Sequence, residues 1–366
     1  MMPQSEQILR RKFIIDGEVR AVTPYRMLQD CSRDGTAGAE DIREEGQVVD
    51  ETLDLLPSNF VFDSGRIQDY LALTMSRAGF KRAVPPVFAD SFTAGKVAKA
   101  LIDAIWMCGN FTLEDLDLKA EWKWNTGPVG NLAALYASIE SATSYIDALG
   151  LYLDEYSFAE NPGGRCLVGF KAVDAGHPKL GKKRRCPSTL GADPSSWIIY
   201  IPFDTCDYRL GGSVLSEETG ARSSLGPDIS DADYFIDCFE VVRELVEDGI
   251  VLSGATVCDG GFLTALKGMC RKGTGAAIDI TSIRDARGEL PVRILFAEVP
   301  GVLIQVSDLD FDYVDAELIL QDIAYFPIGH PVCGADDSIS VNFDAKSGVA
   351  GILQSLLSGQ ASEGED

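Results

Sequence analysis

Two glycine-rich segments in the second half of this 366-residue chain have the composition of anion-binding turns. Asp259-Gly260-Gly261 stands between an expected strand and an expected helix, where glycines let an anion come close to exposed backbone N–H groups. Leu210-Gly211-Gly212-Ser213 has a similar composition, and Ser213 adds a hydroxyl donor. Both segments also fit a tight turn that needs glycine for geometry alone, and the sequence by itself favours that interpretation.

The other residue types that carry chemistry are dispersed along the chain. The nine cysteines occur singly, without a C-x-x-C pair, which argues against a disulfide framework and a structural zinc site. With only two histidines, His177 and His330, a histidine-rich metal site or a catalytic triad is not expected. Lys179 and the basic run Lys182–Arg185 would suit a nucleotide phosphate or an acidic partner, although such a run is more often a solvated hinge.

Charge and composition exclude several classes of function. A formal net charge of −24 disfavours sequence-independent binding to nucleic acid or to an anionic membrane, because neutralising phosphates requires clustered lysine and arginine. The hydrophobic fraction of 46% is typical of a soluble globular protein. No apolar run approaches the ~20 residues of a membrane-spanning helix, and the start lacks the features of a secretory signal. We therefore expect a cytoplasmic protein.

Hydrophobic periodicity predicts the elements that must position these residues. Trp122 and Trp124 lie on one face of an expected strand and are predicted to belong to the core. A Gly-, Asp- and Glu-rich stretch, residues 31–50, and the basic stretch, residues 177–187, are predicted to be loops. The main helices are expected at residues 65–77, 88–107, 129–149, 231–248, 262–272 and 312–321, and the main strands at 12–15, 18–22, 116–124, 165–170, 197–201, 251–255, 277–280, 302–306 and 324–328.

This alternation predicts an α+β fold of α/β-layered type, with two domains that are each a mixed sheet packed with helices. The predicted boundary lies in the loop near residue 190. The expected parts are an N-terminal extension (1–58), an N-terminal domain (59–190), a C-terminal domain (191–345) and a C-terminal segment with a disordered acidic tail (346–366).

Four segments, in this order, resemble the C-terminal synthase half of phosphoribosylformylglycinamidine (FGAM) synthase, a member of the AIR-synthase superfamily. Each motif is weak alone, but their order and spacing over roughly residues 70 to 330 are fairly specific. The segments are Thr74–Gly79 to Pro85 with the helix that follows, Leu118–Trp122 with the helix ending at Leu151, Arg209–Leu215, and Cys258–Leu263 paired with Leu295–Gly301.

The resemblance implies a function in purine biosynthesis. The family uses ATP and Mg²⁺ to activate the formyl-amide oxygen of formylglycinamide ribonucleotide (FGAR), and ammonia from a glutaminase domain or subunit displaces the phosphate. It also implies two AIR-synthase-like domains, and a homodimer or pairing with another synthase half. The residues that the resemblance assigns to nucleotide or phosphate binding are Gly211, Gly212, Ser213, Asp259, Gly260 and Gly261.

The chain departs from the family where the metal is bound. The family's long helix carries a Glu and, four residues later, an Asn, and the corresponding residues here are Lys99 and Asp103. Lys99 reverses the charge at a cation site; Asp103 is either a metal ligand or, preferably, the i, i+4 partner of Lys99. The family's Gly-Lys-Asp-Ser loop is also missing after Leu151, and Phe158 falls near its Asp.

Three hypotheses follow from these features. In the first, the chain is an active FGAM synthase fragment or subunit, and it requires partner chains. In the second, it is a catalytically degenerate paralogue, a pseudoenzyme that keeps the fold as a structural or protein-interaction module, as in some virus-encoded relatives. In the third, which the motif spacing favours less, it is another ATP-using relative such as a selenophosphate or hydrogenase-maturation enzyme.

Overall fold

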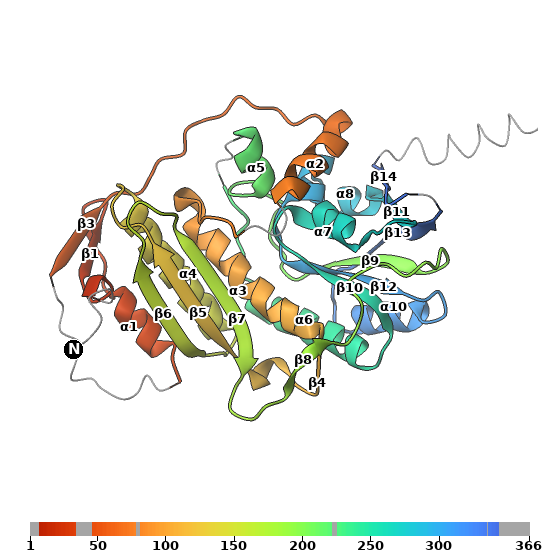
Figure 1. The fold of residues 1–366 in the computed structure, drawn as a ribbon, viewed down its shortest axis with the longest axis horizontal. Coiled ribbons are helices and arrows are strands. Elements are labelled where there is room, and N and C mark those ends of the chain that lie inside the picture. The colour runs from red at the N-terminus through yellow and green to blue at the C-terminus, as the bar shows by residue number, and fades with distance from the viewer. Residues whose placement is uncertain (1–6, 34–45, 78–80, 222–224, 335, 344–366) are drawn as a thin grey trace, which may run out of the picture.

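The computed structural model describes residues 7–33, 46–77, 81–221, 225–334 and 336–343, so the predicted acidic tail lies outside the described residues (Figure 1). Strands of the described residues form four sheets, of three, six, two and three strands, and helices pack against them. This arrangement confirms the predicted α+β class. None of the helices in the described residues is long and apolar enough to span a membrane.

The first half of the chain is organised around a three-stranded mixed sheet. Its central strand, β5 (Leu116–Trp124), runs parallel to β6 (Leu153–Glu160) and antiparallel to β7 (Leu167–Asp174). The side chains of β5 alternate between buried and part-exposed, and Trp122 and Trp124 are fully buried, as predicted. The long helices α3 (Ala89–Ile105) and α4 (Asn131–Ala148) pack against each other, and α3 also packs on β7.

A small sheet precedes this layer and caps α4. Strand β1 (Lys12–Ile15) pairs antiparallel with β2 (Glu18–Val19) and parallel with β3 (Gln47–Asp50). Helix α1 (Pro24–Asp30) lies between β2 and β3 in the sequence. The carboxylate of Asp50 accepts backbone N–H bonds from Gly130, Leu132 and Ala133 at 2.8–3.0 Å. A carboxylate at this position satisfies amides that the first helical turn leaves unpaired. The end of the predicted loop 31–50 is thus a strand that anchors α4.

The second half contains a six-stranded sheet with strand order β10-β12-β9-β13-β11-β14. Strands β9 and β12 are almost completely buried because helices or the first layer cover both faces. The strands are β9 (Trp197–Pro202), β10 (Val251–Val257), β11 (Thr274–Asp279), β12 (Gly301–Val306), β13 (Phe326–Cys333) and β14 (Ile339–Asn342). The helices are α5 (Val214–Thr219), α6 (Ala232–Glu247), α7 (Gly261–Met269), α8 (Thr281–Arg287), α9 (Pro291–Phe296) and α10 (Phe311–Leu320).

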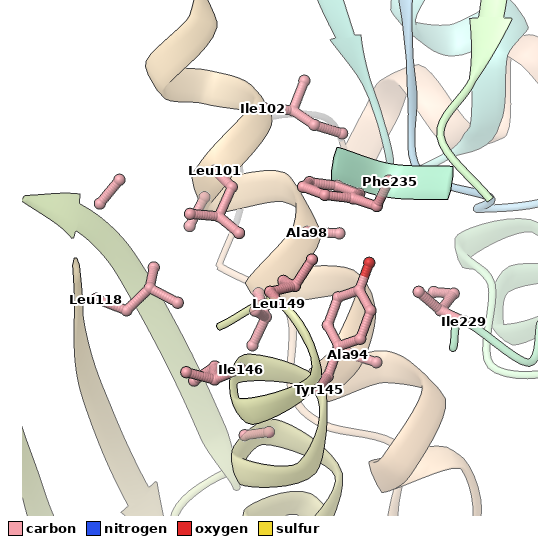
Figure 2. Packing of buried hydrophobic residues seen from close by; sticks show 14 of the residues in the cluster. Ala94, Ala98, Leu101, Ile102, Leu118, Tyr145, Ile146, Leu149, Ile229 and Phe235 are labelled. Atoms are coloured by element: carbon pink, nitrogen blue, oxygen red, sulfur yellow. The ribbon is translucent and has the colours of Figure 1, made fainter. Parts of the chain in front are cut away.

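Alternate residues of the six-stranded sheet belong to two hydrophobic clusters. Ile199 and Ile304 face the cluster that includes α3, α4 and α6, whereas Ile198 and Leu303 face the cluster that includes α7 and α9. The first cluster is continuous between the two halves of the chain. Figure 2 shows this continuity: helix α3 lies between the first sheet and α6, with Leu101 on the side of Leu118 and Phe235 of α6 on the other side.

Two local features differ from the sequence-based expectation. Residues 180–184 form a strand, β8 (Leu180–Arg184), inside the predicted loop, and it pairs with β4 (Met107–Gly109). The prediction failed there because the strand depends on a partner about seventy residues away. Helix α2 (Ile67–Arg77), placed by sequence in the first domain, buries Ile67, Tyr70 and Leu71 in the second cluster. The chain therefore crosses to the second half and returns before α3.

The continuity of the first cluster leads to a stability prediction. Leu101 is fully buried at the centre of that cluster, so Leu101→Ala should lower the free energy of unfolding by about 2–5 kcal/mol. Leu309, which is 94% exposed, provides a matched control, and Leu309→Ala should leave stability nearly unchanged. Urea unfolding followed by circular dichroism measures both effects. Equal stability of the two variants would contradict a single core spanning α3, the first sheet and α6.

Candidate functional site

Charged side chains from four separate segments meet where the two halves of the chain join. Arg82 precedes α3, Lys96 lies on α3, Asp259 follows β10, and Glu298 follows α9. The guanidinium of Arg82 donates to Glu298 at 2.6 Å, to Asp259 at 3.2 Å and to the carbonyl oxygen of Gly212 at 2.5 Å. These contacts bring both glycine-rich segments of the sequence analysis to one place.

Glu298 occupies the starts of two helices. One of its oxygens, Oε1, accepts the backbone N–H of Val214, the first residue of α5, and that of Gly260, just before α7, both at 2.8 Å. Its other oxygen accepts the bond from Arg82. Helix starts attract anions, and here a carboxylate of the protein itself is that anion. The Gly260 N–H, predicted to approach a phosphate, is therefore engaged by Glu298.

The glycines of these segments are required by backbone geometry. Gly260 and Gly261 have φ of +80° and +75°, which side chains disfavour, and a Cβ at Gly261 would come within 2.5 Å of the Cα of Phe296. A Cβ at Gly211 would collide with the carbonyl oxygen of Leu225. The tight-turn interpretation is thus sufficient to explain these glycines.

Ser213 serves as the N-cap of α5. Its hydroxyl donates to the carbonyl of Leu210 at 2.7 Å and accepts the backbone N–H of Ser216 at 3.2 Å. The side chain is buried, with 1% exposure. The hydroxyl that the sequence offered as a ligand donor stabilises the start of the helix.

Asp259 is neutralised by two cations. Lys96 Nζ lies 2.7 and 2.6 Å from its two carboxylate oxygens, and Arg82 contacts one of them. Burial acts to raise the pKa of Asp259, but Lys96 and then Arg82 outweigh it and lower that pKa below its ordinary value. Burial and the neighbouring Asp259 raise the pKa of the adjacent Cys258 thiol to about 12, so Cys258 stays protonated at neutral pH.

Asp103 is also paired. Lys99 Nζ lies 2.5 Å from Oδ2 of Asp103, which confirms the preferred i, i+4 ion pair, and Thr256 donates to Oδ1 at 2.6 Å. Burial acts to lower the pKa of Lys99, but the Asp103 carboxylate raises it above its usual value. The ammonium form of Lys99 is therefore favoured.

These carboxylates do not fit a Mg²⁺ site. Mg²⁺ requires nearly octahedral oxygen ligands at ~2.0–2.1 Å, whereas every carboxylate oxygen of Asp103 and Asp259 already has a donor. Among the residues that the structure describes, no group of three or more His, Cys, Asp or Glu side chains is placed to hold a metal ion. The metal role considered for Asp103 has no support in this geometry.

Apart from Glu298, these charged residues line an open cleft of about 510 Å³ between α3, β7 and β10. It adjoins a second pocket of about 530 Å³, with which it shares Ala100, Asp103 and Phe170. Gly211 and Gly212 line instead a cavity of about 20 Å³, which has room for about one water molecule. The lining of the 510 Å³ cleft comprises Arg77, Lys81, Arg82, Lys96, Lys99, Ala100, Asp103, Val168, Gly169, Phe170, Thr256, Cys258, Asp259, Thr264 and Ala265.

Sequence reasoning missed three residues of this site. Lys96 carries a signal, because it lies one helical turn before Lys99 and therefore on the same face of α3. Glu298 lies in the Phe-Ala-Glu turn that carries the family resemblance, but no role followed from that motif. Arg82 offered no pattern, since its partners are 130 to 216 residues away.

Comparison with known proteins agrees with this architecture. Residues 198–323 match the family described as AIR synthase related protein, C-terminal domain. The structure is similar to that of Thermotoga maritima PurL complexed with FGAR, with a TM-score of 0.54 and 14% identity over 71% of this chain and 42% of that one. PurLQS from the same organism gives a TM-score of 0.51, again at 14% identity, over 71% of this chain and 41% of that one. These likenesses show that the chain shares a fold with part of PurL.

The sequence relatives are more specific. The chain is 27% identical to human phosphoribosylformylglycinamidine synthase over 229 residues, which is 60% of this chain and 16% of that protein. It is also 27% identical to the probable phosphoribosylformylglycinamidine synthase of Caenorhabditis elegans, over 58% of this chain and 17% of that protein. The chain is therefore similar to FGAM synthases, and its residues 198–323 match the C-terminal domain of AIR synthase related proteins. It spans about a sixth of the length of these relatives.

The lowered pKa of Asp259 predicts a pH-dependent contribution to stability. At pH 7, Asp259→Asn should lower the free energy of unfolding by about 1–2 kcal/mol, because it leaves Lys96 and Arg82 short of a counter-charge in a partly exposed site. The folded-state pKa is below the unfolded value of ~3.9. The contribution of Asp259 to stability is therefore complete at pH values above the unfolded-state pKa, and it is lost as the pH falls through the folded-state pKa.

Urea unfolding at pH 7, 5, 4 and 3 measures this dependence. The difference between wild type and Asp259→Asn should shrink below about pH 4. Asp69→Asn, in the exposed ion pair with Arg66, serves as the control and should change stability little at any of these pH values. A difference for Asp259→Asn that stays constant from pH 7 to pH 3 would contradict the ionic role of Asp259.

Proposed function

We propose that this chain acts in phosphoribosylformylglycinamidine synthesis as one part of a larger assembly, and that its cleft binds a phosphate-bearing ligand. The observation that carries the proposal is the cleft between α3, β7 and β10, where five cationic side chains meet two carboxylates in a chain of net charge −24. Cations concentrated in one concave site attract and orient an anionic ligand.

The class of ligand follows from the relatives. The neighbouring PurL structure is complexed with FGAR, a ribonucleotide whose phosphate suits lysine and arginine side chains. ATP is the other ligand that the resemblance implies, and it is larger and more highly charged. The cleft and the pocket beside it measure about 510 and 530 Å³, which is the size range of small-molecule sites.

The proposal includes partner chains. The chain spans about a sixth of the relatives it matches, and synthesis would also require the parts of those relatives that it does not match. A second synthase half or a second copy of this chain, and a glutaminase that supplies ammonia, are the partners we propose. Similarity to PurLQS, named for more than one component, supports an assembly of this kind.

One observation favours a second candidate function. Both carboxylates that face the cleft are paired with lysines of α3, and Glu298 fills the helix starts beside it. An ion network satisfied in this way can stabilise the fold without a ligand. In this alternative the chain is a catalytically degenerate module that contributes structure or protein contacts to its assembly.

Calorimetric titration with FGAR and, separately, with ATP tests the binding proposal. Lys81 lines the cleft and is half-exposed, so Lys81→Glu should weaken binding of the phosphate-bearing ligand about tenfold, or ~1.4 kcal/mol, without affecting folding. Lys183→Glu makes the same charge change on the exposed β8 strand, outside the cleft lining, and should have little effect. Absence of binding by both ligands would contradict the proposal and favour the degenerate module.

A further inference from the structure

In the cleft, two lysines on one face of α3 each pair with a carboxylate. Lys96, Lys99 and Asp103 recur on α3 at a spacing of three and four residues, which places them on one face of the helix. Lys99 contacts Asp103 within the helix, and Lys96 reaches across to Asp259 at the end of β10. The ammonium groups thus contact the carboxylate oxygens that a cation in the cleft would need as ligands.

The contact between Lys96 and Asp259 is of the bidentate kind. Lys96 Nζ lies within 2.7 Å of both oxygens of Asp259, and its side chain is only 16% exposed. A divalent cation at Asp259 would therefore have to displace a largely buried ammonium group or lie beside it. Two positive charges in contact with the same carboxylate repel each other strongly in a partly desolvated site.

Asp103 does not offer an alternative ligand position. Its two oxygens are engaged by Lys99 at 2.5 Å and by the hydroxyl of Thr256 at 2.6 Å. The indole N–H of Trp106 donates to that same hydroxyl at 2.8 Å, which orients its proton toward Asp103. The carboxylate is therefore held by donors from both α3 and β10.

We propose that Lys96 and Lys99 replace a divalent metal in this cleft, so that a phosphate-bearing ligand binds there without Mg²⁺ and meets the lysines directly. This inference rests on the proposed binding function for its ligand. It follows from the disagreement between the metal that the family resemblance implies and the donors that surround Asp103 and Asp259. An ammonium group neutralises phosphate charge as a point charge with three donors.

Titration with Mn²⁺, followed by the electron paramagnetic resonance signal of the free ion, tests the replacement without a phosphate ligand. Wild-type protein should show no binding up to about 1 mM. The double variant Lys96→Met and Lys99→Met keeps the aliphatic length but removes both charges, and it should bind Mn²⁺ at least tenfold more tightly. Wild-type binding below about 100 µM, or equal binding by both proteins, would overturn the inference.

Calorimetric titration with ATP in EDTA and in Mg²⁺ tests the ligand side. Affinity should be equal within about threefold in the two buffers, and Lys96→Met should weaken it at least tenfold in EDTA. Binding that is tenfold or more tighter with Mg²⁺ would overturn the inference while leaving the proposed function intact. Absence of ATP and FGAR binding in both buffers would contradict the proposed function instead, and the Mn²⁺ titration would still decide whether the lysines exclude a metal.

Discussion

The buried guanidinium of Arg82 is the interaction on which the arrangement of the cleft depends. Its side chain is 7% exposed and contacts the carboxylates of Glu298, Asp259 and Glu217 as well as the carbonyl of Gly212. A buried charge is tolerated only when it is paired and hydrogen-bonded. Burial lowers the pKa of Arg82, but the three carboxylates outweigh it and raise that pKa above its usual value, so the arginine stays charged.

From this centre the network organises two helix starts. Glu298, held by Arg82, accepts the first N–H groups of α5 and of the turn before α7, so one carboxylate serves two helices. Asp259, held by Arg82 and Lys96, ties the end of β10 to α3. Helix α3 is consequently apolar on the faces toward α4 and α6 and charged along the face toward the cleft. The fold and the electrostatics of the cleft thus share the same side chains.

The elements that sequence predicted correctly are those with strong local patterns. The periods of α3 and α4 and the alternation in β5 are set within ten to twenty residues, and the Lys99–Asp103 pair lies within one turn of a helix. The turn Asp259-Gly260-Gly261 was also located correctly between a strand and a helix. In each case the residues that determine the structure are neighbours in sequence.

What sequence did not predict depends on distant contacts. Strand β8 requires β4 as a partner, and α2 packs with elements more than 100 residues further along the chain. The role of Arg82 and the pairing of Lys96 with Asp259 join residues at least 130 positions apart. No period or motif specifies such a pairing. For the same reason, the phosphate roles of Gly260 and Ser213 were expectations from the family resemblance, whereas the hydrogen-bond partners of these residues depend on the tertiary fold.

A double-mutant cycle between Arg82 and Glu298 tests the central claim, that a buried ion network organises this cleft, most directly. Arg82→Met, Glu298→Gln and the double variant would be compared with wild type by urea unfolding at pH 7. The account predicts a coupling free energy of about 2 kcal/mol or more, because each single variant removes the partner's nearest counter-charge in a buried site. Single effects that add to within about 0.5 kcal/mol would contradict the claim, since the two side chains would then contribute independently.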